Sequence, residues 1–219
     1  MMRDPVSCST HFLAFIVALF YTLFLYRLSR SKSVRIFGIS ATLLYASSAL
    51  FHMPLWSPTE LRTFQLMDQS MIFVLIAGTF TPLAVLLVPP RVSRIGLFVM
   101  WSLAFIGIFS LWVLPRLPHV ALVSIYIGMG TFALANLLPF LRSIDFSIFA
   151  LTFLGTAIYA AGGICEMLQW PTIVPGVVGH HEVLHICDMI ATACHAVAIM
   201  KLALTLPPRP AAEHAISAG

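Results

Sequence analysis

Charged residues are scarce in this sequence. Asp, Glu, Lys and Arg make up 9% of its 219 residues, whereas hydrophobic residues make up 60%. A soluble domain carries about 25% charged residues, so this chain lacks the charges that a water-facing surface needs. The net charge is +4, but the basic residues do not form the cluster that nucleic-acid binding requires. No nucleic-acid partner is therefore expected.

Cysteine is also scarce, and the sequence contains no Cys-x-x-Cys pair. We therefore expect the four cysteines to be buried, unreactive thiols. Cys187 and Cys194 are seven residues apart on one expected helix, which separates them by about 10 Å along its axis. That spacing excludes a disulfide between them.

Long apolar runs dominate the chain. About 20 helical residues are needed to cross the hydrocarbon core of a bilayer, and the alternating pattern of an outer-membrane barrel is absent. The first run lacks a cleavage site, so we interpret it as a retained helix rather than a secretory signal. The sequence predicts an all-α, seven-transmembrane helix bundle that forms a single membrane domain over 1–219, with a polar tail at 207–219. The expected helices are 10–29, 35–54, 67–88, 94–114, 119–140, 146–168 and 181–206.

Polar residues inside apolar runs are energetically expensive and usually face a cavity or a partner. Ser48 and His52 lie near the end of the second run, Asp68 begins the third, and His181 and His185 open the seventh. The spacing of four residues places His181 and His185 on one helical face. In an antiparallel bundle these three places lie on the same side of the membrane. Three imidazole nitrogens suffice to hold a zinc ion and leave its fourth position open, so the pattern is compatible with an intramembrane metal site.

A second interpretation of the same residues is a zinc protease, because His181-Glu182-x-x-His185 matches H-E-x-x-H with glutamate as general base. Such a protease needs a further ligand downstream. One protease class needs a glycine and a histidine at the positions that Asp188 and Ala191 occupy here. Another class needs a downstream glutamate on a different helix, and the only glutamate that follows is Glu213 in the polar tail. We therefore disfavour this interpretation.

Several blocks, in this order along nearly the whole chain, resemble the haemolysin III family, which is related to the progestin and adipoQ receptor family. The blocks are SALFH at 48–52, MDQSMIF at 67–73, IAGTFTP at 76–82 and GHHEVLH at 179–185. The wider superfamily includes alkaline ceramidases. The resemblance implies a zinc ion held by His52, His181 and His185. It also implies that Asp68 holds or deprotonates the zinc-bound water, with Ser48 behind it.

The resemblance also suggests a function. A zinc-dependent hydrolase acting on a lipid amide or ester in a bacterial plasma membrane is the first expectation, with membrane lipids and a lipid-like substrate as partners. A zinc-containing receptor or lipid-homeostasis sensor is the alternative. A pore-forming haemolysin comes third, because a pore needs a continuous polar stripe and the fourth to sixth runs are nearly free of charge. The sequence does not indicate an oligomeric state.

Three further polar residues have weaker claims. Asp188 lies nearly on the face of His181 but one to two turns deeper, and it replaces an apolar residue that is usual in the family. We expect it behind the metal site. His195 is about 21 Å from His181 along the helix axis, which is too far to share an ion. Glu166 is expected to pair within the bundle.

Membrane orientation is predicted in two ways that disagree. Nine of the 12 Lys and Arg residues fall in the C-terminal segment or near the loops that follow the first, third and fifth apolar runs. This distribution favours a cytoplasmic C-terminus. That orientation places the metal site on the outer side. The receptor relatives imply the reverse, with the N-terminus and the zinc site toward the cytoplasm.

Overall fold

A computed structural model of the chain describes residues 5–28, 31–53, 56–114 and 117–205. Within these ranges it contains seven long helices, each apolar enough to cross a membrane. They are α1 (Pro5–Leu28), α2 (Lys32–His52), α3 (Pro58–Leu87), α4 (Pro90–Val113), α5 (His119–Leu141), α6 (Phe146–Leu168) and α7 (His180–Thr205). The all-α seven-helix prediction is confirmed, and the chain is a multi-pass membrane protein. The expected polar tail, 207–219, lies outside the described residues.

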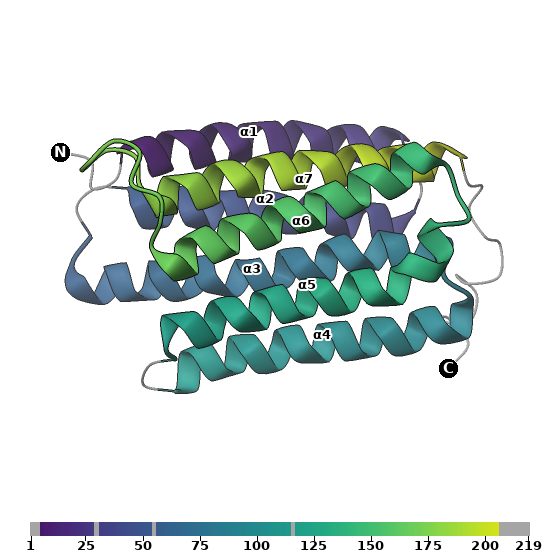
Figure 1. Cartoon of the computed structure of the whole chain (residues 1–219), viewed down its shortest axis with the longest axis horizontal. Helices are drawn as coiled ribbons and strands as arrows, with labels where there is room; N and C mark the ends of the chain where they lie inside the picture. Colours follow the sequence, from purple (N-terminus) through teal and green to yellow (C-terminus); the bar gives the residue numbers. More distant parts are fainter. Residues whose placement is uncertain (1–4, 29–30, 54–55, 115–116, 206–219) are drawn as a thin grey trace.

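The seven helices run lengthwise along the molecule (Figure 1). Helices α1, α2 and α7 lie toward one side, α4 and α5 toward the other, and α3 lies between them. The most buried helices are α3 and α2, whereas α1, α4 and α5 bury much less of their surface. Large apolar side chains such as Phe98 and Phe105 point outward from α4, as expected of a surface that faces lipid.

Helix α3 begins nine residues before the expected position. Its start carries a capping box: the Ser57 side chain accepts a hydrogen bond from the Glu60 backbone N–H, and the Ser57 backbone N–H donates to Glu60 Oε2 at 2.8 Å. Pro58 occupies the first helical position, where its missing N–H costs nothing. The prediction of a start at 67 was wrong because it followed the apolar run, and this first segment is helical but polar. Asp68 therefore lies ten residues inside α3.

Glycines set the spacing of the central helices. A Cβ atom at Gly78 of α3 would lie 2.2 Å from Oγ of Ser40 on α2, and one at Gly107 of α4 would lie 2.3 Å from the Phe73 ring on α3. Such close approach through small residues is typical of helix packing in membranes. It fixes α2 against α3, and with them the places of the polar residues at their ends.

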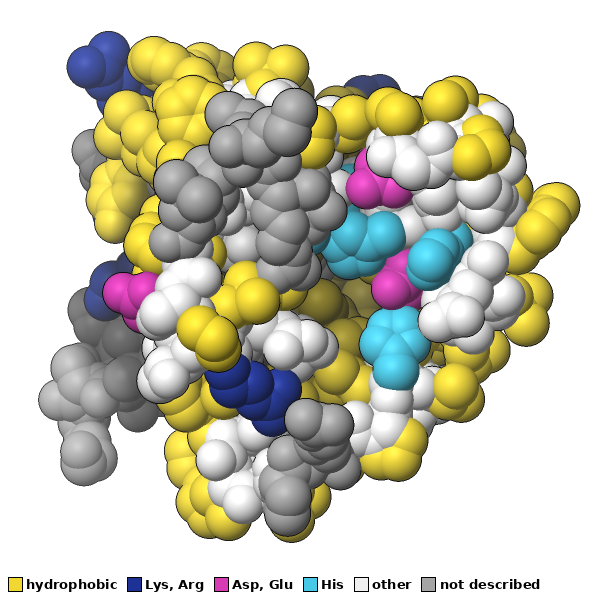
Figure 2. Space-filling model, turned by 90° about the vertical axis from the view of Figure 1, so that its left-hand side faces the viewer, with side chains coloured by type: hydrophobic (Ala, Val, Ile, Leu, Met, Phe, Trp, Pro, Cys, Tyr) yellow, Lys and Arg dark blue, Asp and Glu magenta, His cyan; other side chains and the backbone are white. Residues whose placement is uncertain are grey.

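The antiparallel order brings particular helix ends together. At one end of the bundle α2 and α6 finish while α3, α5 and α7 begin. His52 is the last residue of α2, His119 is the first of α5 and His180 is the first of α7. Figure 2 shows this end from outside: histidine and acidic side chains gather around a hollow with a hydrophobic floor.

The four cysteines are free thiols. Cys8 is buried as expected, whereas Cys165, Cys187 and Cys194 are partly exposed.

Candidate metal centre and its pocket

Three histidines meet at this end of the bundle. Nε2 of His181 lies 3.3 Å from Nε2 of His52, and the ring centres of His52 and His181 lie 4.9 Å and 4.6 Å from that of His185. One ligand nitrogen from each ring lies within 4.8 Å of the other two. The side chains of His52 and His185 are buried, and His181 is partly exposed. The structure therefore brings together the three residues that the sequence singled out.

This arrangement fits a metal ion. Zinc–nitrogen bonds of about 2.0–2.1 Å in a tetrahedron place two ligand atoms about 3.3 Å apart, which is the separation of the His52 and His181 nitrogens. Neutral imidazole nitrogens offer lone pairs, and those of His52 and His185 belong to buried side chains. The cluster of His52, His181 and His185 could hold one metal ion.

Asp68 and Ser48 line the same pocket as the three histidines. Ser48 on α2 is 1% exposed, and its hydroxyl is a hydrogen-bonding neighbour of the Asp68 carboxyl group on α3. Among the described residues, Asp68 is not part of the group whose ligand atoms lie within 4.8 Å of one another. It lies beside the histidine cluster rather than within it.

Glu166, near the end of α6, connects three histidines. Its Oε2 lies 3.5 Å from Nδ1 of His181 and 4.0 Å from Nε2 of His180, and its Oε1 lies 3.4 Å from Nε2 of His119. The expected pairing within the bundle is thus present, but the sequence did not show that it reaches the candidate site. A carboxylate on Nδ1 orients a histidine ring so that its other nitrogen faces a metal. In His181 that other nitrogen faces His52.

His11 of α1 is a site residue that the sequence reasoning missed. Its ring stacks on that of His185 with centres 3.7 Å apart and planes 18° apart, and it lines the pocket. It is 4% exposed, and neither ring nitrogen has a hydrogen-bond partner among the described residues. The available signal was an ionisable side chain within an apolar run, which is a functional indication in a membrane helix.

Glu182, the base that a zinc protease would need, is engaged elsewhere. Its Oε1 accepts a hydrogen bond from the Ser7 hydroxyl at 3.0 Å, and its Oε2 accepts one from the Gly179 backbone N–H at 2.8 Å. Glu182 therefore ties the start of α7 to α1. These bonds give it a structural role and weigh against the protease interpretation.

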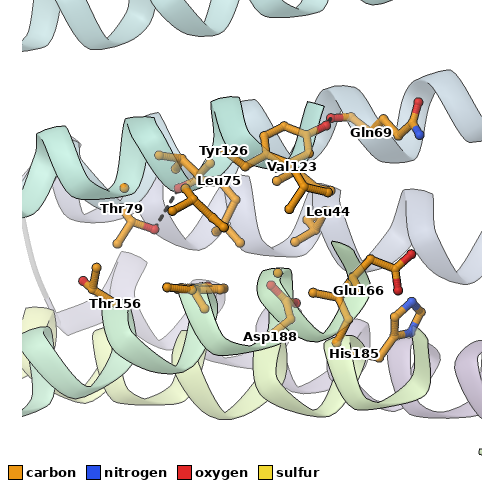
Figure 3. A pocket seen from close by; sticks show the side chains of 18 of the residues that line it. Leu44, Gln69, Leu75, Thr79, Val123, Tyr126, Thr156, Glu166, His185 and Asp188 are labelled. Carbon is orange, nitrogen blue, oxygen red and sulfur yellow. Dashed lines mark hydrogen bonds between the residues drawn. The ribbon is translucent and has the colours of Figure 1, made fainter. Parts of the chain in front are cut away.

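A cavity of about 520 Å³ extends from the histidines into the bundle. Figure 3 shows His185 and Asp188 pointing into it, with Leu44, Leu75 and Val123 on the opposite wall. His195 also lines the cavity. Because His195 is ten residues beyond His185 on α7, the cavity reaches about 15 Å along the helix axis.

Comparison with known proteins adds to this geometry. The family model described as Haemolysin-III related matches residues 1–196, a range that includes all three clustered histidines. The chain is 35% identical over 160 residues to "Hemolysin-3 homolog" of Bacillus subtilis (strain 168), covering 70% of this chain and 68% of that protein. It is 30% identical over 130 residues to "Hemolysin-3" of Bacillus cereus, covering 59% of this chain and 58% of that protein.

Proposed function

This chain belongs to the haemolysin-III related family, and from that premise we propose that it is a zinc-dependent hydrolase that cleaves an amide or ester bond of a membrane lipid. One observation carries the proposal: the three-histidine cluster lies at the head of a largely apolar pocket that also contains an acid, Asp68. Three protein ligands are the number found in catalytic zinc sites, whereas structural sites have four.

A zinc ion held by His52, His181 and His185 would supply Lewis-acid polarisation of a carbonyl group and an activated water. The chain's own residues have separate tasks. Asp68 accepts a proton from the attacking water through its carboxylate, and the Ser48 hydroxyl keeps that carboxylate in place. The Glu166 carboxylate lies 3.5 Å from Nδ1 of His181 and favours a proton on that nitrogen, which leaves the Nε2 lone pair directed at the site.

The position of Asp68 supports this division of tasks. It shares the pocket with the histidines but stands outside their ligand group. A general base needs such a separation, because it must reach the proton of a water molecule rather than the ion itself.

The pocket supports a lipid as the substrate. Its volume of about 520 Å³ is within the range of roughly 300–1,000 Å³ typical of small-molecule sites. Leu44, Leu75 and Val123 supply apolar walls, which suit an acyl chain with its polar head at the histidines. Membrane lipids surrounding the bundle are the source of such a substrate.

The test uses the purified full chain in lipid nanodiscs with ceramide, other N-acyl amides and acyl esters. We expect one zinc ion per chain, release of fatty acid, loss of release on treatment with a chelator, and recovery on adding zinc back. If fatty acid release persists in metal-free protein, the proposed function is wrong.

A zinc-containing receptor or lipid sensor is the second candidate, because the same largely apolar pocket would also suit a ligand that is bound and not cleaved. Saturable, zinc-dependent lipid binding without any product would favour it. A pore is tested by dye release from liposomes. The outward apolar faces of α4 and α5 lead us to expect no release.

A further inference from the structure

A second group of polar residues lies beyond the histidines. Asp188, Tyr159 and His195 line the pocket, and Tyr45 and Thr192 are bonded to this group without lining it. Along α7, the residues that share the face of His181 are spaced alternately by four and three positions. They are His181, His185, Asp188, Thr192 and His195. The same face becomes apolar only at Ile199 and Leu202, which are 0% and 1% exposed. We call Asp188, Thr192 and His195, with Tyr45 and Tyr159, the second polar layer.

Three hydroxyl groups of this layer bond to one another. The Tyr45 hydroxyl donates to Oγ1 of Thr192 at 2.7 Å, and the Tyr159 hydroxyl lies 2.5 Å from the same oxygen. Three hydroxyl groups carry three protons, and these two bonds use two of them. The Tyr45 hydroxyl also lies 3.4 Å from the Asp188 carbonyl oxygen, which is a second acceptor for its proton. When Thr192 donates to Tyr159, the Tyr159 hydroxyl proton is left for a group in the pocket.

Two further atoms of the layer are buried without hydrogen-bond partners among the described residues: Oδ2 of Asp188 and Nδ1 of His195. His195 is held in place, because its ring stacks on Tyr159 with centres 5.7 Å apart and lies so close to Gly155 that a Cβ there would be 2.8 Å from Nε2. Asp188, Tyr159 and His195 all line the pocket. An apolar chain in the pocket would leave these groups unpaired, which is costly in a membrane interior.

A hydroxyl group on the ligand matches what is left over. It can donate to the Asp188 carboxylate and accept from the Tyr159 hydroxyl, two side chains that line the pocket, whereas an ammonium group could only donate. We propose that the second polar layer binds a hydroxyl group carried on the hydrocarbon chain of the lipid, so that the pocket selects hydroxylated chains over plain ones. This deepens the proposed function and rests on it in one respect, that the pocket takes a lipid.

The helix sets the depth of that hydroxyl group. Asp188 lies three residues beyond His185 and His195 lies ten beyond it, which correspond to about 5 Å and about 15 Å along the axis. The preferred hydroxyl therefore lies in the middle of the chain, roughly 5–15 Å from the bond held at the histidines. A hydroxyl next to the head group or at the far tip would not reach the layer.

The experiment measures binding to the full chain in nanodiscs with stearoyl amide and its monohydroxy positional isomers. We expect mid-chain isomers to bind at least about tenfold tighter than stearoyl amide. Asp188→Leu should remove this preference. The matched control is Thr79→Val, which removes a pocket-lining hydroxyl that already bonds to the Leu75 carbonyl at 2.7 Å, and it should keep the preference.

Equal binding of plain and hydroxylated chains to the unmodified protein would overturn the proposal, as would a preference that survives in folded Asp188→Leu. The first comparison needs no variant, so it decides even if Asp188→Leu does not fold. Hydrolysis of the same amides is measured in parallel. A binding preference without turnover contradicts only the hydrolase, and turnover without a preference contradicts only the hydroxyl-binding layer.

Discussion

The histidine cluster and the second polar layer lie in one pocket but are built differently. In the cluster, His52 comes from α2 and its partner His181 from α7, 129 residues later, and the ring nitrogens are directed at one another. In the second layer most groups come from one face of α7, and the Thr192 hydroxyl already bonds to two tyrosines. The cluster could hold an ion, whereas the layer leaves single hydrogen-bonding groups for a ligand. Reaction and selection are therefore expected to be separable by mutation.

The largest separation is expected for Asp68→Asn. If Asp68 acts as the proton acceptor, turnover should fall by about 10²–10⁴-fold, while zinc content and the preference for hydroxylated chains stay unchanged. Fatty acid release, metal analysis and lipid binding measure the three quantities. Asp145→Asn is the control, because it removes a carboxylate at the opposite end of the bundle and Asn remains a good helix cap. Loss of zinc in Asp68→Asn would show that Asp68 is a ligand instead.

His52→Ala removes one of the three nitrogens and should lower zinc affinity by more than the roughly hundredfold limit typical of residues that only support a ligand. Lipid binding in the second layer should persist. Metal content after dialysis against a zinc buffer measures the effect. Ser47→Ala, a neighbouring buried position whose hydroxyl bonds to the Leu44 carbonyl at 2.9 Å, should retain the metal. Unchanged zinc in His52→Ala would rule out the proposed ligand set.

Glu166→Gln tests the support for the cluster. The loss of the carboxylate on Nδ1 of His181 should lower zinc affinity by about 10–100-fold, a smaller effect than removing a ligand. Competition with a fluorescent zinc chelator gives the affinity. The matched control is His119→Gln. Nε2 of His119 lies 3.4 Å from Oε1 of Glu166, whereas His181 contacts Oε2, so this substitution should change zinc affinity little. Equal effects of the two changes would mean that Glu166 acts on the whole mouth of the pocket and not through His181.

The smallest effect is expected in the second layer. Thr192→Val keeps the side-chain shape but removes the oxygen shared by Tyr45 and Tyr159, and should reduce the preference for hydroxylated chains by about threefold with zinc content unchanged. Thr156→Val serves as its control, because the Thr156 hydroxyl lines the same pocket but bonds to the Thr152 carbonyl at 2.9 Å. A change in zinc content in Thr192→Val would show that the two regions are coupled.

The sequence predicted the seven helices because bilayer thickness sets the length of an apolar run. It also predicted that His52, His181 and His185 would meet, since antiparallel order puts those helix ends on one side of the membrane and the family resemblance implied that the three histidines share an ion. It placed the start of α3 too late, because the capping residues around Ser57 are polar and lie outside the apolar run.

The contacts that the sequence did not reveal depend on how each helix is rotated about its own axis. Glu166 reaches His181, and His11 stacks on His185, only because α6 and α1 present those particular faces to the cluster. The same is true of Tyr45 and Tyr159, which meet at Thr192 from α2 and α6. Apolar residues on every side of these helices leave no periodic pattern from which the rotation could be read.

The distance along the chain between His52 and His181 has a consequence for biosynthesis. Since 129 residues separate them, a ribosome must complete α3 to α6 and begin α7 before the second and third candidate ligands can join the first in the membrane. Any ion would be acquired after the last helix has been inserted. A chain arrested before α7 would hold one of the three histidines and would leave the ribosome without metal.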